Sequence, residues 1–530
     1  MKKIRLKKYY LHPITTYLLL ILLVCVVSFI LHMFKLQTTY NAINTKMNII
    51  QRTDFVNNMF SFKEIKKVVS ETASNFHKFP PLYMYLITAI GIAVCEASGF
   101  LDALFKKIFA KIPNRLVTFL IIFVATISSL INEVGFVLLI PLAALIFKSK
   151  NRNPMAGVVA GFAGTAFGYG TSIFIGSIDA LMQPYTRVAA RIIDSTFHIS
   201  LTSNLFIMIV STLVLSIVGT LIMEKRIIPA MGNRREKRLE LTDEIEVIDE
   251  SIDSEQEVLS NDFKEKRGFK WASIAGIVLL LFFIYCLIPN LPLSGLLLDM
   301  EKTTYLEQVF GNIGDDSYFQ EGFTFLVSLI LLIMGLVYGI ASHKFKNDKD
   351  VINMSNSALK DIGQMVGLLF VASQFVSIFK ESNIGTVLVG ILSNFLGGFS
   401  FGGIPFLLLC CLFFIISDFF IVDVQVKWAI FAPAVIPTLM QTNIAPQFVQ
   451  FVMRACDSTM NGISPLYAYF VIYVGYMNIY NNKPNKPVTI GECMRTIAPY
   501  FVIITAVWLL LLFGWYIIGL PIGPGVSPNL

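Results

Sequence analysis

Two oppositely charged residues lie three positions apart in an otherwise apolar segment near the C-terminus. On a helix, Arg454 and Asp457 would share one face. A charged side chain at membrane depth costs roughly 3 kcal/mol or more, so we expect these two to pair with each other or with a ligand. Two interpretations stay open. In the first, the two residues form an internal ion pair that holds a helix break closed. In the second, Arg454 binds a substrate carboxylate while Asp457 responds to a coupling cation.

Oxygen donors surround this pair. Asp457, Ser458, Asn461 and Ser464 supply carboxylate, hydroxyl and amide oxygens over a short stretch. Together with carbonyl groups freed by a helix break, they match the oxygen ligands that hard cations prefer. The pattern predicts a possible Na⁺ site at Asp457 and Asn461.

A second polar group is expected to form the pseudosymmetric partner of this site. It consists of Asn132, Thr171 and Ser172. Hydroxyl groups in membrane helices also bond the carbonyl one turn back, and that alternative stays open for Thr171 and Ser172. Glu96 and Glu133 are lone acidic residues in apolar surroundings, either protonatable coupling groups or neutral hydrogen-bonded acids.

The composition requires a membrane. The chain has 530 residues, of which 55% are hydrophobic and 15% charged, and its mean hydropathy is +0.68. Long runs of Leu, Ile, Val and Phe exclude the alternating strands of an outer-membrane barrel. The sequence therefore predicts an all-α integral membrane protein, and its net charge of +7 indicates basic cytoplasmic loops rather than nucleic-acid binding. The seven cysteines show no metal-site or disulfide spacing.

The chain contains a weak internal repeat. A shift of 292 positions places Pro141 on Pro433, Pro154 on Pro446 and Ser172 on Ser464. Each copy holds an apolar hairpin followed by a helix with a polar, breakable centre. Broken helices survive at membrane depth only where they line a site, so the repeat predicts a duplicated transporter core.

Apolar windows and basic loops predict about nine transmembrane helices and two re-entrant hairpins. The arms of the first hairpin are too short to favour two full spans. The N-terminus is expected in the cytoplasm and the C-terminus outside, and the two halves have opposite orientation. The chain is predicted to begin with an N-terminal span and external loop (1–81), followed by a first repeat (82–224). That repeat contains a cytoplasmic-side hairpin (115–148) and a broken helix (153–193, broken near 164–172). A cytoplasmic linker (225–268) and two spans (269–355) lead to a second repeat (356–530), which contains an external-side hairpin (402–440) and a broken helix (445–478, broken at 454–465).

Several segments resemble the AbgT family of p-aminobenzoyl-glutamate transporters, within a superfamily of ion-coupled secondary carriers. The most specific are KWAIFAPAVIPTLM and RACDSTMNGISPLYAYF, and NEVGFVLLIPLAALIF, IGSIDALM and VASQFVSIFKESNIGTVL add to them. The resemblance implies a homodimer in the cell membrane. It also implies transport of p-aminobenzoyl-glutamate or sulfonamide-type antimetabolites, coupled to a sodium or proton gradient.

The resemblance implies functional roles for Asp179, Trp428, Pro446, Arg454 and Asp457. Trp428 is expected to offer a stacking surface for an aromatic ring, with an interfacial anchor as the alternative. These residues, with Asn461, form the predicted substrate and ion sites.

Two departures from the family pattern lie where an ion or substrate should bind. The second hairpin turn, IVDVQV, is bulky and carries Asp423 and Gln425, and Ile173 replaces an asparagine in the first break. Asp423 and Glu133 are further candidates for ion coupling. Exact substrate, transport direction and the choice between Na⁺ and H⁺ stay open.

The sequence contains no motif of an ATP-driven pump or an intramembrane hydrolase. We therefore expect a carrier rather than an enzyme, without a cofactor beyond the coupling ion. The alternatives are a dicarboxylate or amphipathic-anion carrier of the same superfamily, a channel, or a membrane scaffold. A channel would not need paired breaks, and a scaffold would not need buried Arg454 and Asp457.

Overall fold

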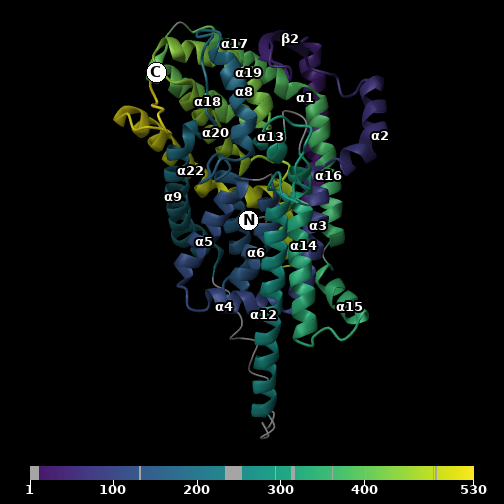
Figure 1. Cartoon of the computed structure of the whole chain (residues 1–530). Helices are drawn as coiled ribbons and strands as arrows, with labels where there is room; N and C mark the ends of the chain where they lie inside the picture. Colours follow the sequence, from purple (N-terminus) through teal and green to yellow (C-terminus); the bar gives the residue numbers. More distant parts are fainter. Residues whose placement is uncertain are drawn as a thin grey trace, which may run out of the picture.

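The computed structural model describes residues 11–130, 133–232, 254–292, 294–311, 317–360, 362–399, 401–481, 483 and 486–530. These residues form a helical bundle with one small two-stranded sheet (Figure 1). The predicted all-α membrane fold is confirmed.

Seven helical stretches within the described ranges are long and apolar enough to cross a membrane. Each exposes apolar side chains that require lipid or a partner surface. The spanning helices are α1 (Pro13–Met33), α3 (Pro80–Ser98), α9 (Leu205–Ile222), α12 (Ser254–Cys286), α14 (Tyr318–Ala341), α16 (Ile362–Glu381) and α22 (Ile490–Ile518). With the two broken helices they match the nine expected spans, although that count stays a prediction.

Both predicted hairpins form. The first consists of α5 (Asn114–Ile127), the short η1 (Ser128–Leu130) and α6 (Val134–Ser149), and the second of α18 (Gly403–Asp418) and α19 (Val424–Gln441). Figure 1 shows the first in the lower half of the bundle and the second in the upper half. Their full re-entrant character stays a prediction.

Two broken helices follow the hairpins. The first consists of α7 (Pro154–Phe167) and α8 (Ser177–Ala190), and the second of α20 (Pro446–Asn461) and α21 (Phe470–Ile479). The breaks therefore cover 168–176 and 462–469, later than predicted. Polar side chains do not end a helix by themselves, and each first half continues to a glycine, Gly168 or Gly462, at its C-cap.

The helix boundaries support the duplication. Helices α6 and α19 end at Ser149 and Gln441, and α7 and α20 begin at Pro154 and Pro446, each pair 292 positions apart. Proline is suited to the first turn of a helix because its missing N–H is not needed there. The repeat seen weakly in the sequence is thus much clearer in the secondary structure.

The predicted external loop contains structure that we did not expect. Strands β1 (Gln37–Ile43) and β2 (Ile49–Phe55) form an antiparallel hairpin, and β1 buries alternate residues against the second repeat. The charged stretch in this loop forms the helix α2 (Phe62–His77). A hydrogen bond from Lys67 to Glu381 fixes α2 to the end of α16 and raises the pKa of Lys67.

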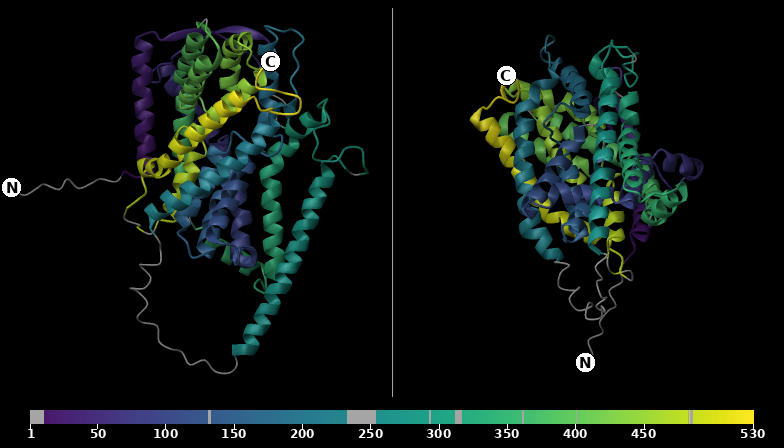
Figure 2. Two further views of the ribbon diagram at one scale, coloured as in Figure 1. Left: turned by 90° about the vertical axis from the view of Figure 1, so that its left-hand side faces the viewer. Right: turned by 60° about the horizontal axis from the view of Figure 1, so that its bottom comes forward.

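Two predicted boundaries were wrong. We expected the apolar segment from about 82 to 105 to form one span. It is divided at Gly99, whose φ of 78° ends α3 before α4 (Phe100–Phe109) begins. The helix α12 begins within the predicted linker and has 33 residues, about 50 Å, so it extends past a hydrocarbon core of about 30 Å. Figure 2 shows it running beyond the lower end of the bundle beside α14. The linker residues 233–253 lie outside the described ranges.

Shorter elements complete the described chain. They are η2 (Leu201–Asn204), the π-helical η3 (Met223–Ile227), α10 (Ile228–Met231), α13 (Tyr305–Phe310), α15 (Asp348–Ala358) and α17 (Ile384–Gly397). The basic segments around α4 and α15 lie at the lower end in Figure 1, whereas the β-hairpin and the C-terminus lie at the upper end. This arrangement agrees with the predicted cytoplasmic and external sides, which stay predictions.

Candidate functional site

The two helix breaks cross at the centre of the bundle. A Cβ atom on Gly170 would lie 2.7 Å from the carbonyl oxygen of Arg454, and one on Gly462 would lie 2.2 Å from the ring of Phe167. Only glycine permits such close approach. Helix α8 packs on α19 and α20 of the second repeat, while α21 packs on α6 and α7 of the first. The repeats therefore interlock at their breaks.

A buried ion pair joins the two broken helices at this crossing. Arg454 Nη1 on α20 donates to Asp179 Oδ1 near the start of α8, and the side chains are 4% and 3% exposed. The expected pairing of Arg454 with Asp457 is therefore wrong. Asp179 is available because α8 begins only after the break and presents its first turn to α20.

The Arg454–Asp179 pair has the features of an anion site. Asp179 Oδ2 accepts a hydrogen bond of 2.9 Å from the N–H of Gly176, at the N-terminus of α8, where a negative group is favoured. Among the described residues, buried Arg454 Nε has no hydrogen-bond partner. A ligand carboxylate could replace Asp179 as the acceptor for Arg454 or bind to this remaining donor.

Asp457 instead belongs to a second buried cluster. Lys427 on α19 pairs with Asp418 at the end of α18 and with Asp457 on α20. The three side chains are 1%, 0% and 2% exposed in the order Asp418, Lys427 and Asp457. We call them the Lys427 triad. Our sequence analysis noted Lys427 only within a motif and missed Asp418, although one basic and one acidic residue in the apolar arms of a hairpin were a usable signal.

Trp428 is part of the packed core. Its indole is completely buried, donates a hydrogen bond of 2.8 Å to Thr186 Oγ1 on α8, and meets the ring of Phe414 edge to face. Thr186 in turn donates to Gln450 on α20, at 2.6 Å. The interfacial-anchor alternative is therefore wrong. Trp428 links the hairpin to both broken helices, and its indole is fully covered by protein.

The predicted sodium ligands do not converge. The hydroxyl of Ser458 donates to the carbonyl of Ala455, and that of Ser464 accepts from the N–H of Leu466. Asp457 is engaged by Lys427. Asn461 Oδ1 is buried and, within the described part of the chain, has no hydrogen-bond partner.

The polar residues of the first break have other partners. Thr171 forms hydrogen bonds to Met208 O at 2.7 Å and to the hydroxyls of Ser211 and Thr212, all on α9. Ser172 accepts from the N–H of Phe174. The expected bond to a carbonyl one turn back is thus not the one that Thr171 makes. Asn132 lies outside the described residues.

Residues of both hairpin turns form hydrogen bonds with tyrosines of the first broken helix. Glu133 accepts a hydrogen bond of 3.0 Å from Tyr169, and Gln425 donates one of 3.1 Å to Tyr185 on α8. Asp423 caps α19 by accepting from the N–H groups of Gln425 and Val426. Asp423 and Glu133 both lie near enough to Tyr169 to act on it electrostatically.

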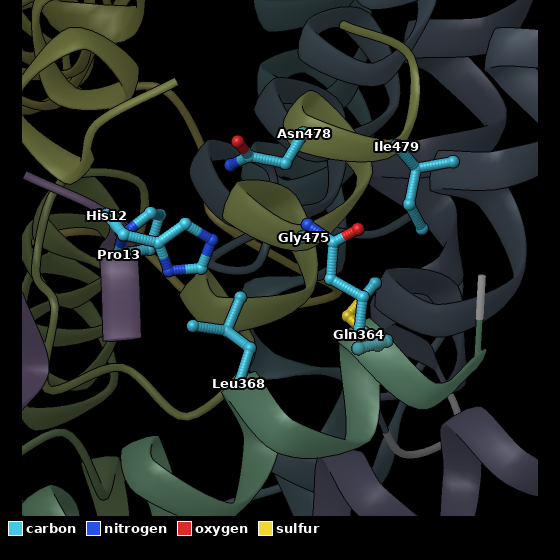
Figure 3. Close-up of a pocket in the computed structure, with 8 residues that line it drawn as sticks. His12, Pro13, Gln364, Leu368, Gly475, Asn478 and Ile479 are labelled. Atoms are coloured by element: carbon cyan, nitrogen blue, oxygen red, sulfur yellow. The ribbon is translucent and has the colours of Figure 1, made fainter. Parts of the chain in front are cut away.

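The described residues line three larger cavities, of about 600, 280 and 250 Å³. The upper one, about 600 Å³, is bounded by α8, α13 and the β-hairpin turn and includes Arg187. The lower one, about 250 Å³, lies between α3, α6, α16 and α21 and includes Glu96 and Lys148. The pocket in Figure 3, beside His12 and Asn478, has a volume of about 10 Å³, room for a single water molecule.

Pro446 has a local structural position. It begins α20 directly after Ala445, whose N–H donates to the carbonyl of Pro528 near the C-terminus. This contact fixes the start of the helix that carries Arg454 and Asp457. Pro446 does not approach either ion pair through a described contact.

Comparison with known proteins places the chain in a family. The p-aminobenzoyl-glutamate transport protein of Escherichia coli strain K12 is 28% identical over 523 residues, which cover 98% of this chain and 94% of that protein. Two solved structures also match. The Alcanivorax borkumensis YdaH transporter is 27% identical with a TM-score of 0.45, and the match covers 97% of this chain and 100% of that one. Neisseria gonorrhoeae MtrF, described among antimetabolite efflux pumps, is 27% identical with a TM-score of 0.47, and the match covers 98% of each chain. The profile of the AbgT putative transporter family matches residues 6–530, and this chain therefore belongs to the AbgT family of membrane transporters.

Proposed function

We propose that this transporter is a secondary carrier that moves p-aminobenzoyl-glutamate-like or sulfonamide-type aromatic acids across the cytoplasmic membrane, coupled to a sodium or proton gradient. It has no catalytic step of its own. The observation that carries the proposal is the buried pair of Arg454 and Asp179 at the crossing of two broken helices. A substrate carboxylate competes with Asp179 for Arg454, and the first turn of α8 favours the anion during the exchange.

The arrangement around the pair favours a carrier over a channel or a scaffold. The upper and lower cavities are lined by different sets of helices, and buried ion pairs join α8, α18, α19 and α20. A channel needs a continuous pore, and a scaffold gains nothing from buried charges that cost free energy to desolvate. A carrier uses such pairs because they can exchange partners as access alternates.

The substrate class comes from the relative named for p-aminobenzoyl-glutamate transport and from the chemistry of the site. Arg454 suits a carboxylate because its guanidinium group can form two parallel hydrogen bonds. A dicarboxylate or amphipathic-anion carrier would use the same arginine. The two carrier classes therefore differ in whether the preferred substrate contains an aromatic ring.

A ligand screen tests the proposal. The purified protein is heated in Na⁺ or choline buffers with p-aminobenzoyl-glutamate, simple dicarboxylates or sulfonamides. A ligand at one hundred times its Kd stabilises the folded state by about 2.7 kcal/mol. Stabilisation by aromatic acids alone supports the proposal. Stabilisation by dicarboxylates alone would instead indicate a dicarboxylate carrier. No stabilisation and no uptake with any compound contradicts both.

We further propose a homodimer in the cell membrane, with the N-terminus cytoplasmic and the C-terminus external. The exposed apolar faces of the spanning helices give room for a partner as well as for lipid. Mass measurement of the protein in lipid nanodiscs tests the dimer.

A further inference from the structure

We propose that the Lys427 triad holds one exchangeable proton, carried by Asp418, and that this proton is the coupling ion. The inference rests on the proposed function for its coupling step. It assigns a role to Asp418 and Lys427, which contact neither Arg454 nor Asp179 in the described structure.

Counting charges in the triad leads to the proton. Two carboxylates and one ammonium group carry a net charge of −1 when all three are ionised. The groups are 0% to 2% exposed, and an uncompensated charge at that depth is costly. Arg454, the nearest other cation on α20, is already paired with Asp179. One proton makes the triad neutral.

The surrounding elements supply no further compensating charge among the described residues. Helix α17, which packs on both arms of the hairpin, has no titratable side chain. Arg187 on α8 lines the upper cavity, and Tyr40 on β1 donates to Asp54. The other titratable neighbours are neutral or acidic, so they cannot offset the negative charge. They are Cys410 and Cys411 on α18, Cys456 on α20, Asp423 at the turn, Tyr185 and Asp179 on α8, and Glu133 and Tyr169 near the first break.

The geometry favours a proton over Na⁺. The ammonium group of Lys427 already occupies the position between the two carboxylates, where a metal cation would bind. Na⁺ also needs five or six oxygen ligands, by analogy with other hard cations, and the hydroxyls of Ser458 and Ser464 are directed to the backbone. Asp418 and Asp457, however, contact the same ammonium group, so their carboxyl groups lie close together and one of them can hold a proton.

Asp418 is the member of the triad best placed to carry the proton. Its Oδ1 contacts Lys427, and its buried Oδ2 has no hydrogen-bond partner outside the triad among the described residues. A carboxyl group with a free oxygen can accept a proton without breaking the bond to lysine. Asp457 would then remain ionised and paired with Lys427.

Helix α20 connects the proton to the substrate. It carries Arg454 on one turn and Asp457 on the next, so a shift of this helix changes both the anion site and the triad. When a substrate carboxylate takes Arg454 from Asp179, α20 loses one anchor to α8, and the triad becomes the main ionic contact of α20 with the hairpin. A change in the protonation of Asp418 alters that contact.

The test uses the full-length protein and a substrate-free readout first. Infrared difference spectra between acidic and alkaline buffer should contain the C=O stretching band of a protonated carboxyl group. We expect Asp418→Asn to lose this band and Asp418→Glu to restore it at a shifted position. Asp194→Asn, which removes an exposed carboxylate bonded only to nearby Thr196, should leave it unchanged. A band that persists in Asp418→Asn would overturn the assignment.

The coupling step is tested in proteoliposomes with p-aminobenzoyl-glutamate and an internal pH dye. One linked proton changes the apparent substrate affinity by up to about tenfold per pH unit. In Asp418→Asn the change in apparent substrate affinity per pH unit should fall below about twofold. This variant should still exchange substrate when the concentrations inside and outside the proteoliposomes are equal. Transport driven by a Na⁺ gradient and insensitive to pH in the wild-type protein would overturn the proposal, even if the variant failed to fold. If the wild-type protein transports no aromatic acid, the proposed function fails, while the infrared result still decides whether Asp418 holds a proton.

Discussion

The two repeats share a backbone but differ in the chemistry of their hairpins and broken helices. Helices α6 and α19 end, and α7 and α20 begin, 292 positions apart. At five positions where the first repeat has only uncharged side chains, the second repeat has four charged residues and one tryptophan. The corresponding pairs are Asp418 and Thr126, Lys427 and Gly135, Trp428 and Phe136, Arg454 and Phe162, and Asp457 and Thr165.

Aromatic packing takes the place of ion pairs in the first repeat. Phe162 stacks on Tyr473 with ring centroids 4.4 Å apart, and Phe136 stacks on Tyr469 at 5.0 Å. Stacked rings fix helices without needing a charged partner. The comparison teaches that both copies keep the broken-helix frame, while the second carries most of the buried charges and the first contributes Asp179 and aromatic packing.

The largest expected effect comes from breaking the triad. Lys427→Met leaves Asp418 and Asp457 buried without a cation and should cost about 3 to 5 kcal/mol of stability. Thr126→Val, at the position that corresponds to Asp418, removes only a hydrogen bond of 3.4 Å to Gly164 and should cost less than about 1 kcal/mol. Denaturation of both variants in detergent measures the difference, and equal losses would contradict the account.

Substitutions at Arg454 and at the matching residue of the first repeat distinguish a role in substrate binding from a role in packing. Arg454→Ala should reduce carboxylate transport at least a hundredfold, about 2.7 kcal/mol, while Asp179 keeps its bond to Gly176 and the protein still folds. Phe162→Ala, at the matching position of the first repeat, should lower stability without weakening substrate affinity in the folded fraction. Binding and melting are measured on the same samples. Loss of folding in Arg454→Ala with unchanged affinity would make the ion pair purely structural.

Asp457→Asn tests coupling more gently because it keeps the size of the side chain and one oxygen. Removing its charge should weaken binding of the coupling ion at least tenfold, about 1.4 kcal/mol, with substrate affinity changing only through linkage. Thr165→Val at the matching position should leave the ion dependence unchanged. Half-saturation by H⁺ and by Na⁺ in the transport assay provides the measurement, and an unaltered ion dependence in Asp457→Asn removes this residue from the coupling site.

The smallest expected effect concerns the tryptophan. Trp428→Phe retains an aromatic ring, as Phe136 does in the first repeat, but loses the hydrogen bond to Thr186. We expect a loss of about 1 kcal/mol in thermal stability and little change in substrate specificity. Altered preference among aromatic acids, with normal stability, would instead return Trp428 to the role of a stacking surface.

The sequence predicted the frame better than the contacts. Pro154 and Pro446 mark helix starts locally, and the glycines after them mark the breaks, so both broken helices could be found without the fold. The partner of Arg454 could not, because Asp179 is 275 residues away and meets it only when the breaks cross. Asp457 was the obvious candidate because it is close in sequence, but it pairs with Lys427 on α19.

Thiol accessibility at the two hairpin turns tests the central claim, that the repeats give alternating access to a common site. Cysteines are placed at Gln425 and, separately, at Ser128, with Cys25 replaced by serine because the other native cysteines are buried. A membrane-impermeant reagent should modify position 425 from outside and position 128 from inside, and substrate should change the two rates in opposite directions. Modification of both positions from the same face, or equal changes with substrate, would contradict the account.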